Sequence, residues 1–191
     1  QFSTVRVARK LEDNSQHAVK IVSKHADDNM ALLSKEIAIL SKIRHPAIVK
    51  LTEAYETNDE VYLVTPRALG GELFHLIAEQ GYLSESACRS ITSKLLSAIA
   101  YLHRKGIMHR DIKVTPNCPL AKLTACPAVC VCTNSIQPEN VLLDDATNRS
   151  SFSPSGSSAD DVKILLIDFG CAKMFDATSD HERSSSLRGT E

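Results

Sequence analysis

The sequence predicts an α+β fold with two lobes, a small lobe rich in β-strands and a second lobe that is partly helical. Short runs of β-branched residues lie beside polar turns in 1–25 and again between 48 and 64, which is typical of antiparallel strands. A break rich in proline and glycine at 65–71 predicts a hinge, and helical spacing of apolar residues follows it. We therefore expect residues 1–66 to form the first lobe and the start of the hinge, and residues 67–191 to form the second lobe.

Composition places the chain among globular proteins with one sizeable core. Its 191 residues are 43% hydrophobic and 24% charged, and the formal net charge is −1. No apolar run approaches the roughly 20 residues of a membrane span, and the N-terminus carries no secretory signal pattern. We expect a soluble, intracellular and cytoplasmic protein that binds neither nucleic acid nor membranes.

The first lobe should contain a hairpin, a helix and two further strands. Residues 1–25 alternate around a polar turn, as a hairpin does. Apolar residues recur at helical spacing through 29–43, and Pro46 ends this helix because proline disfavours helical geometry in the residue before it. The runs 48–51 and 61–64 then predict two more strands.

The second lobe should begin with two helices. A short helix is expected to start at Glu72–Ile77. Ser84 is a suitable N-cap for a long amphipathic helix that Gly106 ends. The apolar runs 141–143 and 162–167 predict two short buried strands further along the chain.

Two segments of unusual composition interrupt the second lobe. Residues 144–161 are rich in serine and aspartate and predict a flexible loop. Four cysteines crowd together earlier in the chain, and their spacing fits structural zinc sites poorly, so a zinc module and an unstructured insert both remain open. The solitary Cys88 and Cys171 are expected to be buried small hydrophobes. The four crowded cysteines are Cys118, Cys126, Cys130 and Cys132.

Two polar stretches can carry chemistry. In His109-Arg110-Asp111-Ile112-Lys113, the aspartate supplies an acceptor for a hydroxyl proton and the lysine supplies a cation for a phosphoryl group. Asp168-Phe169-Gly170 directly follows a predicted buried strand, and a carboxylate beside a turn-forming glycine suits Mg²⁺ coordination. An ordinary turn is the alternative for this second stretch.

These stretches stand at set distances from three other motifs. Upstream lie Ala18-Val19-Lys20-Ile21 and Gly70-Gly71-Glu72-Leu73-Phe74, and downstream of the central stretch lies Asn140. Together the motifs resemble the signature set of eukaryotic serine/threonine protein kinases. The resemblance is strongest to the calcium/calmodulin-dependent group and runs through nearly the whole chain. It implies a bilobal protein-kinase-like fold, here truncated at both ends.

The resemblance implies ATP and Mg²⁺ as cofactors and assigns a role to each matching residue. Lys20 would hold the phosphates, with Glu36 orienting it, although a solvated lysine and a solvated glutamate are the plain alternatives. The implied contacts to ATP come from Val5, Ala18, Lys20, Glu36, Thr65 and Glu72. The implied catalytic residues are Asp111 and Lys113, and the implied Mg²⁺ ligands are Asn140 and Asp168.

The resemblance also implies partners and regulation. The substrate would be a protein serine or threonine, and Arg110 would bind a phosphate added to the activation segment by an upstream kinase. Calcium/calmodulin would act through segments outside this sequence. Candidate phosphate acceptors are Ser184, Ser185, Ser186 and Thr190.

The sequence departs from the family pattern in three places. The glycines of the phosphate-binding loop would lie before residue 1, and the chain stops at Gly189-Thr190-Glu191, before the helices of a complete substrate-binding lobe. Between Lys113 and Pro138, where the family continues without a gap, 24 residues intervene. Removing 114–137 restores the family sequence.

Residues 114–137 have features of a retained or mis-predicted intron. Their length corresponds to 72 nucleotides, a multiple of three, and a valine codon begins with GT while a glutamine codon can end with AG. A spliced transcript that still encodes them would refute this hypothesis. Two functions stay open: an incomplete and poorly active protein kinase, and a non-catalytic pseudokinase-like nucleotide-binding or scaffold module.

Overall fold

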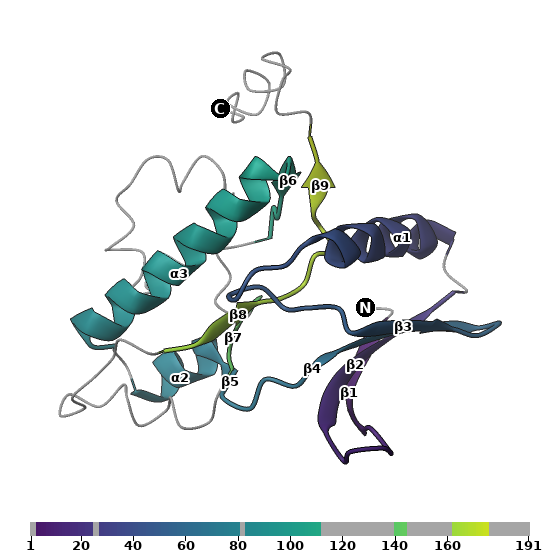
Figure 1. The fold of residues 1–191 in the computed structure, drawn as a ribbon, viewed down its shortest axis with the longest axis horizontal. Coiled ribbons are helices and arrows are strands. Elements are labelled where there is room, and N and C mark those ends of the chain that lie inside the picture. The colour runs from purple at the N-terminus through teal and green to yellow at the C-terminus, as the bar shows by residue number, and fades with distance from the viewer. Residues whose placement is uncertain (1–2, 25–26, 81–82, 112–139, 145–161, 176–191) are drawn as a thin grey trace.

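A computed structural model describes residues 3–24, 27–80, 83–111, 140–144 and 162–175. Figure 1 shows the antiparallel strands of the first lobe on one side and the long helix of the second lobe on the other. The elements in chain order are β1 (Ser3–Arg9), β2 (Gln16–Ser23), α1 (Asp27–Lys42), β3 (Glu53–Glu56), β4 (Glu60–Pro66), β5 (Gly71–Glu72), α2 (Leu73–Gln80), α3 (Glu85–Arg104), β6 (Ile107–Met108), β7 (Val141–Leu143), β8 (Ile164–Leu166) and β9 (Lys173–Met174).

The first lobe is a four-stranded antiparallel sheet with one helix on it. The strand order is β1-β2-β4-β3, and the β1–β2 pair is the predicted hairpin. Side chains alternate between the two faces, so Val22, Val61 and Leu63 point to one side and pack against Leu33 of α1. The predicted helix at 29–43 is confirmed by α1.

One strand of the first lobe was predicted in the wrong place. Residues 48–51 do not join this sheet, and the strand that pairs with β4 is Glu53–Glu56. The reason is a competing partner: the Val49 N–H donates to Leu166 O at 3.0 Å, and the Leu166 N–H donates to Ala47 O at 2.9 Å. This segment is therefore tied to β8 of the second lobe.

The second lobe is organised around α3. Ser84 caps its N-terminus, because its Oγ accepts a hydrogen bond from the Ala87 N–H at 3.2 Å, as predicted. Gly106 follows the helix with φ of 68°, where a Cβ would lie 2.6 Å from Phe175 O. The buried face of α3 consists of Ala87, Cys88, Ile91, Leu95, Ala98, Ile99 and Leu102.

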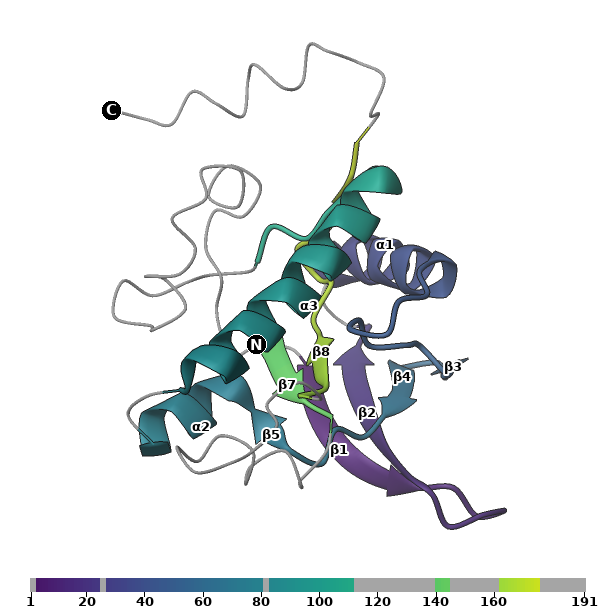
Figure 2. The same cartoon turned by 60° about the vertical axis from the view of Figure 1, so that its left-hand side comes forward.

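Two small sheets complete the second lobe. The first has the order β5-β7-β8 (Figure 2), and the second pairs β6 with β9 (Figure 1). Glu72, expected in a helix, lies instead in β5, opposite Leu142 of β7. This pairing fixes Glu72 beside the strand that follows Asn140.

One continuous core joins the two lobes. Ile39 and Ile43 of α1 belong to the same buried cluster as the apolar face of α3 and Phe169. Cys88 lies in this core as predicted, whereas the prediction for Cys171 was wrong, because its side chain is exposed. No helix among the described residues is long and apolar enough to span a membrane.

Several predictions concern residues outside the described ranges. They include the insertion at 114–137 with its four cysteines, the candidate phosphate acceptors near the C-terminus, and all of the predicted loop 144–161 except its first residue. Asp144 itself is ordered by backbone hydrogen bonds: its N–H donates to Lys163 O, and its carbonyl accepts from Leu69 N–H, both at 3.1 Å.

Candidate active site

A cavity of about 510 Å³ lies between the first sheet and strands β7 and β8. Its size falls in the range of sites for small molecules and cofactors, and its lining mixes apolar side chains with a few charged ones. The sheet contributes Val5, Ala18, Lys20, Leu63 and Thr65, the helix α1 contributes Glu36 and Leu40, and the second lobe contributes Glu72, Asn140, Leu142, Leu165, Ile167 and Asp168.

Three charged groups of the cavity lining contact one another. Lys20 Nζ donates to both carboxylate oxygens of Glu36, at 2.9 and 3.0 Å, and to Asp168 Oδ1 at 3.3 Å. Burial lowers the pKa of Lys20, but attraction to Glu36 and Asp168 outweighs burial and leaves this pKa above its ordinary value. Lys20 is therefore a fixed cation facing the cavity.

Removing the cation should destabilise the fold. Glu36 is 5% exposed, so Lys20→Met would leave a buried carboxylate without its partner. We expect a loss of about 2–3 kcal/mol in the free energy of unfolding, below the value for fully buried pairs because Lys20 keeps some solvent contact. Urea unfolding measures this loss, and Lys20→Met/Glu36→Leu should recover most of it. An unchanged stability in Lys20→Met would contradict the pairing.

Asp111 and Asn140 lie together although 28 residues separate them in the sequence. Asn140 Nδ2 donates to the backbone O of Asp111 at 2.7 Å and to Asp111 Oδ2 at 3.0 Å. The Ile167 N–H donates to Asn140 O at 2.9 Å, which holds Asn140 beside the strand that leads to Asp168. Because the amide nitrogen faces Asp111, the side-chain oxygen of Asn140 is left to act as an acceptor or a metal ligand.

His109 anchors this region to the core. It is 3% exposed, its Nε2 lies 3.1 Å from Ile167 O, and its ring packs edge-on against Phe169 with centroids 4.7 Å apart. The Asp111 N–H points at Nδ1 over 3.4 Å, so the neutral tautomer with its proton on Nε2 fits both neighbours. Burial lowers the pKa of His109 and keeps the ring neutral.

Acid should therefore destabilise the fold. The unfolded chain binds a proton on this imidazole near its ordinary pKa of about 6.5, whereas the folded chain binds one only at lower pH. The stability contribution is full above about pH 6.5 and is lost as the pH falls through the lowered folded value. Burial also lowers the pKa values of His45 and His103, which add to the effect. Denaturation at about pH 7.5 and about pH 5.5 should show a smaller acid loss in His109→Phe than in the wild type, and equal losses would contradict this account.

Two residues in the site have a backbone conformation that is uncommon for side-chain-bearing residues. Arg110 has φ of 66° and Asp168 has φ of 58°. Asp168 is held by the Gly170 N–H, which donates to Oδ1 at 3.1 Å, and Arg110 by its Nε, which donates to Cys171 O at 2.8 Å. Such strained positions concentrate at functional sites, where surrounding contacts maintain them.

The structure thus brings together most of the residues that the sequence singled out. Val5, Ala18, Lys20, Glu36, Thr65, Glu72, Asn140 and Asp168 all line the cavity, and Asp111 adjoins Asn140. Thr65 is held near the cavity wall by its Oγ1, which lies 3.4 Å from Ala18 O. Lys113 lies outside the described residues, so its position relative to Asp111 stays a prediction.

Sequence reasoning missed part of the cavity lining. Leu142 and Leu165 are half-buried between fully buried neighbours in β7 and β8, so they face the cavity rather than the core. The alternation of strand side chains is the signal that could have identified them. Arg67 also lines the cavity and donates to Gln16 Oε1, and its position in the hinge gave no comparable signal.

The residues present suit a nucleotide with its magnesium ion. Carboxylate and amide oxygens are ligands that Mg²⁺ accepts, and this metal commonly takes only one or two protein ligands beside substrate phosphates. Asp168 and Asn140 supply such oxygens, and Lys20 supplies a cation for phosphate. Within the described ranges, no three His, Cys, Asp or Glu side chains are placed to hold a metal on their own.

Comparison with known proteins finds protein kinases, in agreement with the motifs of the sequence. The family model described as protein kinase domain matches residues 1–117. Calcium/calmodulin-dependent protein kinase type 1 from Macrobrachium nipponense is 34% identical over 181 residues, covering 92% of this chain and 41% of the relative. Calcium-dependent protein kinase 5 from Plasmodium berghei is 36% identical over 171 residues, covering 90% of this chain and 24% of the relative.

A second kind of kinase is also similar. Human 3-phosphoinositide-dependent protein kinase 1 is 30% identical over 192 aligned positions, covering 99% of this chain and 28% of the relative. The chain therefore spans less than half the length of each of these three relatives. The resemblance to serine/threonine kinases predicted from the motifs is confirmed, with calcium-regulated kinases among the similar proteins.

Proposed function

Because the chain belongs to the protein kinase domain family, we propose that it is an incomplete catalytic domain of an ATP-dependent protein serine/threonine kinase. The reaction would transfer the γ-phosphoryl group of ATP to a hydroxyl of a protein. The observation that carries this proposal is the convergence of Lys20, Glu36 and Asp168, with Asn140 and Asp111 beside them, around one cavity. We also propose that the two lobes divide after Pro66, where β4 ends.

Each residue would act through position and charge. The phosphoryl group in flight is strongly anionic, so fixed cations and preorganised ligands lower its energy most. Lys20, held by Glu36, would bind phosphate oxygens, and Asp168 and Asn140 would hold Mg²⁺, which neutralises phosphate charge when bound. Asp111, oriented by Asn140, would accept the proton of the substrate hydroxyl. Val5, Ala18, Thr65 and Glu72 would bind the nucleoside.

The insertion at 114–137 should impair this chemistry in the chain as written. The family match ends at residue 117, which supports an interruption shortly after Lys113. Closing a longer loop costs little, since its entropy grows only logarithmically with length, and Asn140 indeed reaches Asp111. Lys113, however, loses the short connection to Pro138 that the family pattern would give it, and catalytic groups tolerate displacements of only about 1 Å.

A nucleotide-dependent shift in unfolding temperature tests the proposal on the full chain. ATP with Mg²⁺ should raise this temperature, and ATP without Mg²⁺ should raise it less. Without the metal, the side-chain oxygens of Asp168 and Asn140 have no divalent cation to bind beside the phosphates. In Lys20→Met the shift should be much smaller than in the wild type. An absence of any shift with ATP, with or without Mg²⁺, would contradict a nucleotide site.

The alternative is a non-catalytic, pseudokinase-like binding module, which the interruption after Lys113 favours for this chain. Such a module would bind nucleotide yet stay inactive after 114–137 is deleted. For the kinase, we propose intracellular proteins with serine or threonine acceptors as substrates. Activation by an upstream kinase, or by calcium/calmodulin as in one similar protein, would act through segments outside the described residues.

A further inference from the structure

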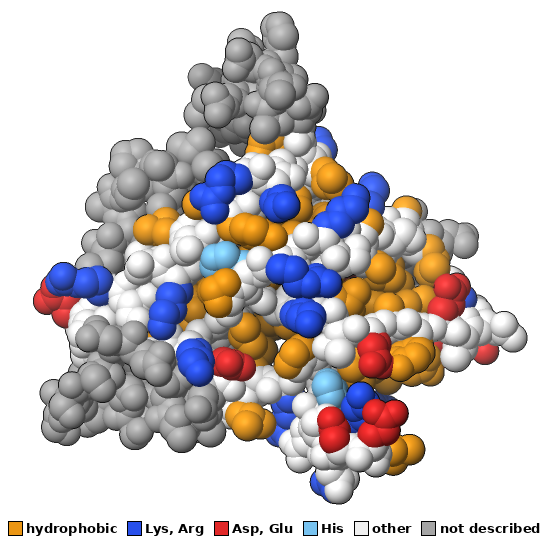
Figure 3. All heavy atoms as spheres, viewed as in Figure 1, with side chains coloured by type: hydrophobic (Ala, Val, Ile, Leu, Met, Phe, Trp, Pro, Cys, Tyr) orange, Lys and Arg blue, Asp and Glu red, His pale blue; other side chains and the backbone are white. Residues whose placement is uncertain are grey.

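A row of basic side chains joins the C-terminal parts of α1 and α3. Figure 3 shows lysine and arginine side chains gathered over these helices and the segment between them, whereas acidic side chains on this face lie mostly over the β1–β4 sheet. All members of the row are exposed. The basic row consists of Lys35, Lys42, Arg44, Arg104 and Lys105.

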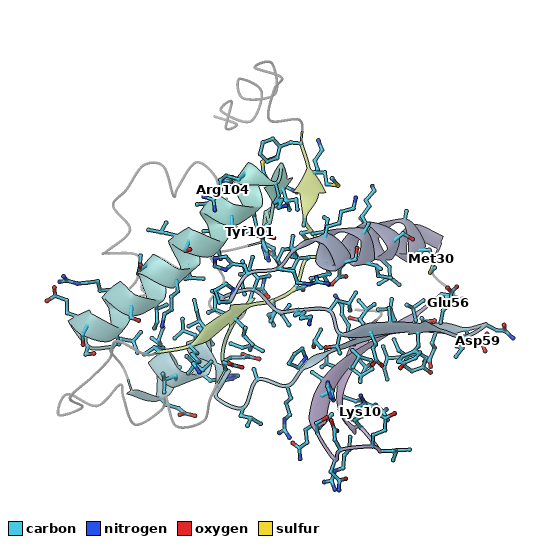
Figure 4. All side chains as sticks on the ribbon, viewed as in Figure 1. Lys10, Met30, Glu56, Asp59, Tyr101 and Arg104 are labelled. Carbon is cyan, nitrogen blue, oxygen red and sulfur yellow. The ribbon has the colours of Figure 1, made fainter. Side chains whose placement is uncertain are left out.

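Contacts between the two helices make the row continuous. Lys35 and Lys42 are seven residues apart in α1, which places them on one side of the helix about 10 Å apart along its axis. The Arg44 N–H donates to Tyr101 Oη at 2.8 Å, so the chain after α1 is fastened to α3. Arg104 follows Tyr101 by about one turn, and Figure 4 shows both on the last turns of α3.

Two further contacts fix the middle of the row. Arg44 Nη1 donates to the carbonyls of Leu40, Ser41 and Ile43, at 3.3, 3.2 and 2.7 Å, and so satisfies the C-terminal end of α1. The His45 ring packs against Tyr101 with centroids 5.3 Å apart. These contacts give the cations a defined arrangement across two helices.

The charge of the row is not neutralised within the described part of the chain. Some cations elsewhere have carboxylate partners: Lys20 binds Glu36, Lys24 binds Glu56, and Arg89 binds Glu85. Others, such as Arg6 and Arg9, have none among the described residues, but they do not belong to a row. No described carboxylate lies within ion-pair distance of any member of the row. Neighbouring like charges repel each other, so an anion that covers them gains binding energy and removes this repulsion.

We propose that the basic row is a docking site for an extended, carboxylate-rich peptide segment of a partner protein. The members of the row come from two helices and the segment between them, so an extended peptide, at about 3.3 Å per residue, would contact several of them. A membrane surface fits less well, because peripheral binding usually adds apolar side chains that insert. Among the described residues, no large exposed hydrophobic side chain falls within the row itself, although Leu32 precedes Lys35 in α1, Leu96 lies two turns before Arg104 in α3, and Met174 lies opposite Ile107.

A peptide bound along the basic row would contact both α1 and α3 and so hold the two helices in a fixed arrangement. Because α1 carries Glu36, the partner of Lys20, a bound peptide would favour the arrangement in which this ion pair is formed. The docking proposal itself does not rest on phosphoryl transfer, since binding of a peptide is measured without ATP. Its failure and the failure of the proposed function are therefore separate outcomes.

Fluorescence anisotropy with labelled hexaglutamate tests the docking site on the full chain. Hexaglutamate should bind saturably at about 50 mM salt and much more weakly at about 500 mM, whereas hexaserine should not bind. Lys42→Glu/Arg104→Glu should weaken hexaglutamate at least fivefold. The control Arg6→Glu/Arg9→Glu changes the net charge equally, on exposed positions of β1, and should change the affinity by less than twofold.

Several results would overturn the proposal. They are no saturable binding of hexaglutamate, an equal loss in both double variants, and capture of the wild type by phosphatidylserine vesicles without any binding of hexaglutamate. Acidic residues in the last turn of a helix oppose the helix dipole, and Lys42 and Arg104 lie in the last turns of α1 and α3, so Lys42→Gln/Arg104→Gln serves as a gentler variant. Its thermal unfolding should match that of the wild type, and it too should weaken binding; unchanged binding in this variant would also count against the site.

Discussion

Deleting residues 114–137 should raise the rate of phosphoryl transfer at least about 100-fold over the chain as written. The deletion joins Lys113 directly to Pro138 and so returns both ends of the central loop to one tight connection. The gain should appear mainly in kcat, because the groups that would bind ATP come from other segments, around β1, β2, α1 and β8. Transfer of radiolabelled phosphate from ATP to a basic protein substrate measures the two rates.

A matched control separates loop repair from simple shortening. Deleting 147–158, within the serine-rich segment, shortens the chain elsewhere and should leave the low rate of the full chain unchanged. Equal rates in the full chain and the 114–137 deletion would contradict the account of the insertion. If both were inactive yet bound ATP with Mg²⁺, the non-catalytic alternative would be favoured.

Asp111→Asn, made in the chain that lacks 114–137, should lower kcat by about 10²–10⁴-fold. Asparagine keeps the size of the side chain but cannot accept the hydroxyl proton. The KM for ATP should change little, since Asp111 contacts Asn140 and is not part of the cavity lining. The same phosphate-transfer assay at saturating ATP measures this loss.

A carboxylate elsewhere provides the comparison for Asp111. Asp59→Asn, in the exposed connection before β4, makes the same chemical change far from the cavity lining and should leave kcat within about twofold of the parent. If Asp111→Asn retained full activity, another group would have to accept the proton, and the central stretch would lose its assigned role.

Local sequence signals predicted the local structure well. The hairpin β1–β2, the helix α1 and the capped helix α3 each follow from periodicity or from a capping residue that acts within a few positions. The failures came from long-range pairing. Residues 48–51 look like a strand of the first lobe, but their backbone groups bond to β8, more than 100 residues later in the chain.

The sequence predicted which residues form the site, but it did not predict the contacts between them. Lys20 contacts Asp168, which lies 148 positions later in the sequence, and Asn140 contacts Asp111, 29 positions earlier. Periodicity and capping signals act over only a few residues, so they cannot predict contacts at such sequence separations. The exposure of Cys171 also could not be predicted from the sequence. It depends on the turn that follows Asp168, and the positive φ of Asp168 has no clear signal in the sequence. The basic row escaped sequence reasoning since its members come from two helices joined through Tyr101.

The most direct test is a crystal structure of the chain without 114–137, grown with Mg²⁺ and a non-hydrolysable ATP analogue. The account predicts the nucleotide in the cavity between the sheet and β7–β8, with Lys20 on phosphate and with oxygens of Asp168 and Asn140 on the metal. A nucleotide bound elsewhere, or a metal without either of these two ligands, would contradict it.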